Sequence, residues 1–384
     1  MKIQKILIPI CFALIFGIAG FLAGMFYSEQ TNRPVIAYHN EKNAQSDKIV
    51  DTKLLPDIQS SKSNVLIGYV QDFRDPATFD ITHLSHIIFS FAHPTKDGGL
   101  LLNGDSAIKN LQTLVKKAHE QDKKVMLAVG GWYHLEGGES YDYFKTAIQD
   151  PTARTKLVNE LTSLVEREQL DGIDIDFEHP RSQEDAKHLK EFTKKLSEAL
   201  KVQKKELSIA VNAKIHSVAG TEITSVIYDP EMFEYVDHVN IMAYDGQWDG
   251  GYNAANLSPY SYSENIVAYW SKLFDSHQIS KDKLVLGVPF YAQPENSEAK
   301  QIAYSTIIKH DATSSEQDKI KMNGTTYYFN GKKTIERKTK LALEHGFGGM
   351  MLWEAGHDAQ GPYSLTAAIS EILETPPQKL YTKK

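Results

Sequence analysis

The sequence predicts a (β/α)8 barrel with a small insertion after the seventh strand. Short apolar runs alternate with amphipathic helical stretches, which is the pattern of βα units around a parallel sheet. Eight such runs lie within roughly 310 residues, the size expected of a closed barrel. The first run is not followed by the G-x-G-x-x-G pattern, which argues against an open dinucleotide-binding sheet.

The elements follow one another in a regular order. The expected strands are Val65–Val70, His86–Ala92, Lys124–Val129, Gly172–Glu178, Leu207–Ala213, His238–Tyr244, Leu284–Phe290 and Gly349–Trp353. The expected helices are Ala107–Glu120, Thr152–Glu168, Glu184–Leu200, Tyr262–Phe274, Thr334–His345 and Leu365–Leu373. Residues 292–333 depart from this alternation, and Thr326–Lys332 within them is typical of a hairpin arm. We expect this insertion to form one wall of a cleft.

The N-terminus carries a long uncharged segment. Ile6 to Tyr27 contain no charged residue and follow Lys2 and Lys5. Because a spanning helix needs about 20 apolar residues and a signal peptide core only about 7–15, we interpret residues 1–28 as a membrane anchor, with a cleaved signal peptide as the alternative. Residues 29–62 are a polar tether, 63–375 the barrel and 376–384 a C-terminal tail. We therefore expect an exported protein, membrane-anchored with an extracellular catalytic domain or secreted.

Composition excludes several function classes. The net charge is −7 and Lys and Arg are scattered, so no nucleic-acid partner is expected. The only cysteine is Cys11, which leaves the exported body without a disulfide. The histidines show no metal-ligand spacing such as H-x-x-x-H, so the sequence offers no case for a metal or a cofactor.

The fourth expected strand carries a row of carboxylates. Because strand side chains alternate with a period of two, Asp174, Asp176 and Glu178 point to one face, and Ile173 and Ile175 point to the other. Like charges this close together cannot all ionise freely. Catalytic groups in such barrels lie at the C-terminal ends of the strands, where Glu178 stands.

Three interpretations of this row remain open on these residues alone. The first is an Asp-x-Asp pair that binds magnesium, and the second is a row neutralised by buried Lys or Arg. The third is glycoside hydrolysis. Two carboxylates side by side on one strand are too close to straddle a scissile bond, so this interpretation needs one acid and a helper that orients a group of the substrate.

Aromatic residues gather at the same rim. Trp132, Trp248 and Trp353 follow or end the third, sixth and eighth strands, Tyr244 ends the sixth, and Tyr291 follows the seventh. Sugar rings have flat apolar faces that aromatic rings can cover. A rim of this kind favours a carbohydrate ligand.

The motifs resemble those of glycoside hydrolase family 18, the chitinases and their relatives. Asp171-x-x-Asp174-x-Asp176-x-Glu178 is similar to the signature D-x-x-D-x-D-x-E of that family. The other matching segments, in the family's order, are Gly130-Gly131 with Trp132, Met242–Asp245, Gly287–Tyr291 and Gly348–Trp353. Together they cover nearly the whole barrel.

The resemblance implies a substrate-assisted retaining hydrolase, an exception to the usual two-carboxylate scheme. Glu178 would protonate the glycosidic oxygen, and the 2-acetamido oxygen of the sugar would attack the anomeric carbon. Asp176 would hold the acetamido N–H, Tyr244 the acetamido oxygen, and Asp174 would share a proton with Asp176. Further substrate contacts are implied for Asp245, Met242, Trp353, Trp132, Trp248 and Tyr291.

The implied substrate is a glycan that contains N-acetylglucosamine, and no cofactor or metal is required. A chitinase-like enzyme would cut β-1,4-linked N-acetylglucosamine polymers or oligomers. The same motifs suit an endo-β-N-acetylglucosaminidase that acts on glycoprotein glycans or peptidoglycan. The alternative of another class is a non-hydrolytic chitinase-like lectin.

The sequence departs from the family pattern near the carboxylates. Ala128 replaces a serine, so we expect Asp174 to lose a hydrogen-bond partner. Phe177 and His179 replace a tryptophan and a tyrosine; Phe177 should face the helices and His179 the rim. The loop after Asp245 is short, which leaves the shape of the cleft wall open.

Overall fold

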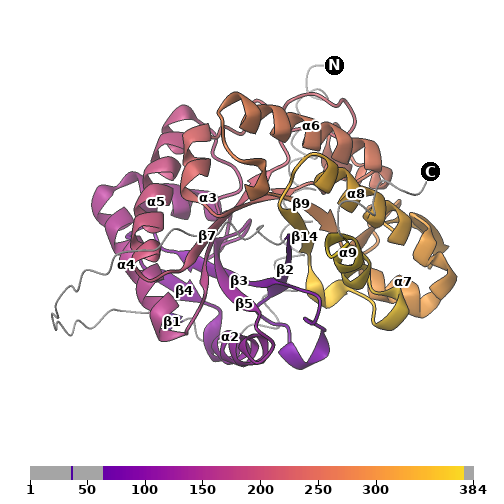
Figure 1. Ribbon diagram of the computed structural model, residues 1–384, viewed down its shortest axis with the longest axis horizontal. Helices are drawn as coiled ribbons and strands as arrows, with labels where there is room; N and C mark the ends of the chain where they lie inside the picture. Colours follow the sequence, from indigo (N-terminus) through magenta and orange to yellow (C-terminus); the bar gives the residue numbers. More distant parts are fainter. Residues whose placement is uncertain (1–35, 38–63, 376–384) are drawn as a thin grey trace, which may run out of the picture.

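Eight parallel strands close into a barrel in this computed structural model, which describes residues 36–37 and 64–375. Along the sheet, each strand pairs with the next, and β14 pairs with β2 to close the ring (Figure 1). The strands are β2 (Val65–Gln71), β3 (His86–Pro94), β5 (Lys124–Gly130), β6 (Gly172–Asp176), β7 (Glu206–Asn212), β8 (His238–Met242), β9 (Leu284–Pro289) and β14 (Gly349–Trp353). The predicted fold is confirmed.

Helices surround the barrel, as Figure 1 shows. Those that match expected helices are α2 (Gly104–His119), α4 (Pro151–Arg167), α5 (Gln183–Val202), α6 (Tyr260–Ser276), α8 (Lys332–Glu344) and α9 (Leu365–Leu373). Two elements were not expected, the helix α3 (Ser140–Gln149) and the short strand β4 (Leu100–Leu102). Asp150 separates α3 from α4, because its side chain caps Ala153 and Pro151 starts the next helix.

Two apolar layers result from the alternation of side chains along the strands. One set of positions packs outward against the helices and forms the large core. The other set points into the barrel and forms a smaller core that includes Ile67, Tyr69, Ile88, Met126 and Met351. The polar side chains discussed below occupy further inward positions of the same strands.

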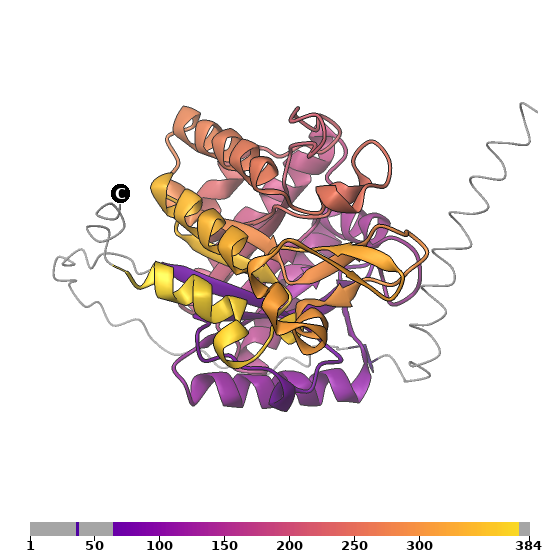
Figure 2. The same ribbon diagram turned by 90° about the vertical axis from the view of Figure 1, so that its right-hand side faces the viewer.

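The insertion after β9 forms its own small sheet beside the barrel. Its strands are β10 (Tyr291–Pro294), β11 (Ile302–Ala303), β12 (Lys319–Met322) and β13 (Thr325–Tyr328), with α7 (Tyr304–His310) between β11 and β12. A hairpin is present as the antiparallel pair of β12 and β13, drawn in orange in Figure 2, but its bounds differ from the expected Thr326–Lys332, because β13 ends at Tyr328 and Lys332 begins α8. The Tyr252 hydroxyl donates to the carbonyl of Pro294, which ties the loop after β8 to this insertion.

The predictions for the termini lie mostly outside the described residues. The anchor or signal segment 1–28 and the tail 376–384 lie outside the described residues. So does the tether 29–62, apart from residues 36–37, and so does residue 63 at the start of the predicted barrel. Ile36–Ala37 form β1, which pairs with β4. Among residues 36–37 and 64–375, no helix has the length and apolar character needed to cross a membrane.

Candidate active site

The carboxylate row lies as the alternation predicted. Asp174 and Asp176 point into the barrel, while Ile173 and Ile175 belong to the outer core. The strand is shorter than expected: β6 ends at Asp176, so Glu178 lies just beyond it at the C-terminal rim. The physical reason is at Gly130, the partner of Asp176 on β5, whose φ of 121° ends the regular ladder.

Asp174 is completely buried and fully engaged. Its carboxylate accepts hydrogen bonds from the hydroxyls of Tyr69 at 2.8 Å and Ser208 at 2.5 Å, and from the side-chain amide of Asn240 at 3.2 Å. Burial raises its pKa to about 6, although the three donors oppose this shift. Because donors occupy both carboxylate oxygens, this residue is poorly placed to coordinate a magnesium ion.

No Lys or Arg neutralises Asp174 or Asp176 among the interactions that the described residues show. The second interpretation of the row, buried neutralisation by basic side chains, is therefore wrong for these two residues. Neutral hydrogen-bond donors stabilise Asp174, and the raised pKa of Asp176 favours its protonated form.

Asp176 is only 4% exposed, and its Oδ1 has no hydrogen-bond partner within the described part of the chain. Burial raises its pKa well above the ordinary value, and the charges of Glu178 and Asp174 raise it further. Gly130 makes room for this residue: a Cβ at Gly130 would lie 2.2 Å from the carbonyl oxygen of Asp176. A buried, unsatisfied carboxylate oxygen is costly unless a ligand donates to it.

Glu178 stands at the mouth of the barrel with 19% of its side chain exposed. Its backbone carbonyl accepts a hydrogen bond from the Tyr228 hydroxyl, which also binds the N–H of Asn212 on β7. Burial, and to a lesser extent the carboxylate of Asp245, raises its pKa to about 8. Glu178 therefore carries its proton at neutral pH, as a general acid must.

Tyr244 and Asp245 follow β8 and face the same opening. The Tyr244 ring is mostly buried, and burial raises the pKa of its hydroxyl well above the ordinary value, so it stays a neutral donor. Asp245 accepts hydrogen bonds from Tyr291 and from Gln247. We expected Tyr291 to contact substrate, but it is only 2% exposed and its hydroxyl is committed to Asp245, so it positions that residue.

Trp353 is the last residue of β14 and packs against the inner core of the barrel. Its ring is 6.0 Å from Phe91 in a stacked arrangement and 5.6 Å from Tyr69. Behind it, the fully buried Glu354 accepts a hydrogen bond from Arg74 and fixes the backbone at this point. Met242 is half-buried and packs against the same inner core. These contacts are compatible with the substrate contact that the resemblance implies for Trp353.

Two exposed tryptophans, Trp132 and Trp248, lie on segments that follow β5 and β8. Trp132 is 45% exposed and lies edge-on to His179, with ring centroids 5.1 Å apart. Trp248 is 59% exposed and contacts Tyr252. A pocket of about 240 Å³, including space open to solvent, adjoins Glu178 and Trp132. Its other lining residues are Gly131, Glu139, Tyr141, Phe177, His179 and Arg181.

The departures from the family pattern have different consequences. Ala128 pairs with Asp174 in register and offers it no donor, as expected, but Tyr69, Ser208 and Asn240 supply donors from other strands. Phe177 packs in the outer core, as expected. Burial lowers the pKa of His179 to about 4, so at neutral pH this ring is uncharged beside Glu178, 3.8 Å away.

The residues that support the row were not expected. Tyr69, Ser208 and Asn240 hold Asp174, and Tyr228 holds Glu178. Alternation along β2, β7 and β8 places the first three on the inward face, but their contact with Asp174 depends on the register and closure of the barrel. Tyr228 comes from an irregular segment, and no pattern in the sequence indicates its contact.

The fold is a closed barrel with Glu178 just beyond the end of its fourth strand and Asp176 as the last residue of that strand. The sequence of residues 65–358 matches the family described as Glycosyl hydrolases family 18. The chain belongs to this family.

The relatives with similar sequences include a chitinase-like effector and an endochitinase. A chitinase-like effector from Moniliophthora roreri is 31% identical over 228 residues, covering 54% of this chain and 52% of the relative, so the chain matches about half the length of that protein. Endochitinase 1 from Metarhizium robertsii is 24% identical over 360 residues, covering 78% of this chain and 82% of the relative.

Solved structures have the same fold. The GH18 chitinase ChiB from Flavobacterium johnsoniae superposes with a TM-score of 0.67 at 25% identity, covering 82% of this chain and 94% of that one. A chitinase-like agglutinin from Robinia pseudoacacia has a TM-score of 0.66 at 18% identity, covering 80% and 99%. A class V chitinase from Nicotiana tobaccum in complex with NAG4 has a TM-score of 0.67 at 16% identity, covering 81% and 99%.

Proposed function

We propose that this protein hydrolyses β-1,4-linked N-acetylglucosamine chains by a substrate-assisted mechanism that retains the anomeric configuration. The observation that carries the proposal is the complementary state of two neighbouring acids, Glu178 and Asp176. Burial and the charge of Asp245 keep Glu178 protonated, while the buried Oδ1 of Asp176 has no donor among the described residues. One group is ready to give a proton, and the other is ready to receive an N–H.

The reaction follows from this placement. Glu178 protonates the glycosidic oxygen as the bond to the anomeric carbon breaks. The acetamido oxygen of the same sugar attacks the anomeric carbon and forms an oxazolinium ion, whose N–H donates to Asp176. Asp176 stabilises the positive charge, and the Tyr244 hydroxyl donates to the acetamido oxygen. The deprotonated Glu178 then takes a proton from a water molecule as that water attacks the anomeric carbon. This attack opens the oxazolinium ring and restores the acetamido group, with net retention of the anomeric configuration.

Asp174 supports this chemistry without touching the sugar. Its three hydrogen-bond donors hold its carboxylate in one orientation beneath Asp176. The two acids share a low-dielectric interior, so their titration belongs to the pair. No metal or cofactor takes part in any of these steps.

The substrate class is tested with a panel. Chitin oligomers, a high-mannose glycoprotein and peptidoglycan contain the same N-acetylglucosamine unit in different surroundings. We expect cleavage of the chitin oligomers, in keeping with the chitinase names among the relatives. Cleavage of the glycoprotein or the peptidoglycan alone would replace this substrate with that of an endo-β-N-acetylglucosaminidase.

A second candidate is a lectin that binds the glycan without cutting it. The likeness to a chitinase-like agglutinin motivates this candidate. The proton-bearing Glu178 argues against it. Parent protein and Glu178→Gln are compared for binding and hydrolysis of chitin tetramer; a parent that binds but releases no product over days would establish the lectin.

We further propose that residues 1–28 direct the protein out of the cytoplasm, based on the uncharged stretch from Ile6 to Tyr27 after Lys2 and Lys5. Mass spectrometry of the N-terminus of the native protein, together with its partition between membrane and medium, distinguishes a retained anchor from a cleaved signal. Recovery of the intact protein in the cytoplasm would contradict export.

A further inference from the structure

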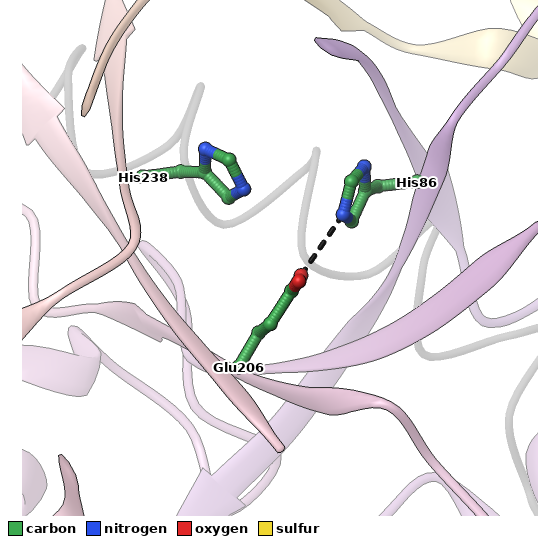
Figure 3. Close-up of side chains that lie close together, drawn as sticks. All are labelled: His86, Glu206 and His238. Atoms are coloured by element: carbon green, nitrogen blue, oxygen red, sulfur yellow. Dashed lines mark hydrogen bonds and ion pairs between the residues drawn. The ribbon is translucent and has the colours of Figure 1, made fainter. Parts of the chain in front are cut away.

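Two histidines and a glutamate meet at the opposite end of the barrel from the active site. His86, Glu206 and His238 are the first residues of β3, β7 and β8. Figure 3 shows the three side chains converging from separate strands. One ligand atom from each residue lies within 4.8 Å of the other two, and His86 Nε2 is 2.9 Å from Glu206 Oε2.

The register of the barrel creates this cluster. The three residues are far apart in sequence but occupy inward positions of their strands, because side chains two residues apart on one strand share a face. Two residues further along β7 and β8 stand Ser208 and Asn240, which hold Asp174. The cluster therefore lies at the N-terminal end of the strands, and catalysis occurs at the other end.

The hydrogen bonds of His86 suit a ligand role. Its Nδ1 lies 2.9 Å from Ser85 Oγ, and that hydroxyl is also 3.1 Å from the carbonyl oxygen of Leu66. When the hydroxyl donates to this carbonyl, Nδ1–H donates to Oγ, and Nε2 faces the Glu206 carboxylate with a lone pair. A nitrogen lone pair and a carboxylate oxygen repel each other at this distance. A proton or a metal ion must therefore lie between His86 Nε2 and Glu206 Oε2 in that arrangement. Metal-bound histidines are held by an oxygen at their other nitrogen in the same way.

Glu206 lies at the edge of the cluster. Its Oε2 faces His86, and its Oε1 faces Lys124. Its side chain remains 26% exposed, which gives an ion a route from solvent, whereas both histidine rings are buried.

We propose that His86, Glu206 and His238 form a binding site for a divalent transition-metal ion of the zinc type, which joins three strands at the floor of the barrel. Two imidazoles and one carboxylate are a ligand set that zinc accepts, with water in the fourth position. Zinc–ligand bonds of about 2.0–2.2 Å require the widest ligand pair to close by roughly 1 Å.

The competing arrangement is a plain ion-pair network. Lys124 Nζ binds the other oxygen of Glu206, and a protonated His86 would satisfy Oε2 without any metal. In that arrangement the cluster has no special affinity for zinc, and Lys124 would repel a second cation. The two arrangements therefore predict opposite results in a metal titration.

The test is a titration of the tag-free protein, first dialysed against a chelator, with ZnCl2 in a calorimeter near pH 7.5. We expect one site per chain with a dissociation constant in the micromolar range or tighter. Glu206→Gln and His238→Gln should each weaken binding at this site at least ~10-fold, since second-shell changes alone cost 10–100-fold. Excess ZnCl2 should raise the melting temperature of the parent by at least about 2 °C but leave that of Glu206→Gln unchanged.

His119→Gln is the matched control. His119 Nε2 also contacts a carboxylate, that of Asp171 at 2.8 Å, but this pair is more exposed and forms no ligand cluster with a second histidine among the described residues. Zinc affinity should be the same in His119→Gln as in the parent. The proposal is overturned if the parent shows no site tighter than about 1 mM, or if Glu206→Gln and His238→Gln bind zinc as the parent does.

Discussion

The Ser208 hydroxyl donates to Asp174 at 2.5 Å from the neighbouring strand. Ser208 stands on β7 in register with Asp174 on β6. On the other side of Asp174, β5 offers only the methyl group of Ala128. The buried acid therefore takes its donors from β7, β8 and β2 instead of β5.

Because Asp174 takes its donor from Ser208 and not from position 128, we expect a large effect of Ser208→Ala and a small effect of Ala128→Ser. Ser208→Ala removes a donor to a buried acid, so we expect kcat to fall about 10-fold and the free energy of unfolding to fall by about 1–3 kcal/mol. Ala128→Ser adds a donor where both oxygens are already satisfied, so kcat should change less than ~3-fold. Steady-state kinetics and chemical denaturation of both variants measure this. A larger loss in Ala128→Ser than in Ser208→Ala would show that we have misplaced the supporting donors.

The pH profile follows from the two pKa values at the site. Glu178 acts while protonated and its pKa is about 8, so kcat/KM should fall tenfold per pH unit above about pH 8. Burial raises the pKa of Asp174 to about 6, so activity should also fall below that pH as the pair gains its second proton. Initial rates from pH 4 to 10 check both limbs. An alkaline limb near pH 5 would mean that Glu178 is not the acid.

Glu178→Gln should lose at least 10³-fold in kcat, because it has no proton to donate. The same variant should be more stable than the parent at neutral pH. The folded pKa is raised above the unfolded value, so the parent loses stability as pH rises from about 4.5 to 8, and the glutamine does not. We expect a gain of roughly 1–3 kcal/mol at pH 7 and almost none at pH 4. Denaturation at both values tests the sign, and a gain that is the same at pH 4 and pH 7 would refute the linkage.

Asp176→Asn should reduce kcat about 10²-fold or more while chitin oligomers still bind, since its carboxylate acts on the developing oxazolinium charge. Oligomers without the N-acetyl group should not be cleaved by the parent, because they lack the internal nucleophile. The matched experiment compares acetylated and deacetylated chains of equal length. Equal rates on the two would place the nucleophile on the protein.

The exposed and half-buried tryptophans should differ in kinetics. Trp132→Ala removes a flat surface at the rim, so KM for long oligomers should rise about 10-fold with kcat nearly unchanged. Trp353→Ala removes the floor under the reacting sugar, so kcat should fall as well. Trp270, buried against Phe233 and Phe274 on the outer side, is not a suitable control because its loss would damage the core. Tyr363→Ala, at an exposed position, serves instead.

Much of the barrel could be predicted because its signals are local. Apolar runs and helical periodicity located the eight strands and the helices that match them, and alternation gave the faces of Asp174 and Asp176. The strand boundary at Glu178 could not be predicted, because it depends on where Gly130 on another strand turns away.

The supporting residues could not be assigned for a related reason. The contacts of Asp174 with Tyr69 and Asn240 join residues that are far apart in sequence, and only the closure and register of the barrel bring them together. The same holds for His86, Glu206 and His238, which have no metal-ligand spacing along the chain. The sequence shows that Ala128 cannot donate to Asp174, but it does not show that Tyr69, Ser208 and Asn240 donate instead.

The most direct test of the proposed mechanism is proton NMR of the products formed by the parent enzyme from chitin tetramer within the first minutes. Substrate-assisted catalysis by Glu178 and Asp176 predicts that new reducing ends appear as the β-anomer and convert to the equilibrium mixture only by mutarotation. New reducing ends that appear first as the α-anomer would contradict the account, as would the absence of any product.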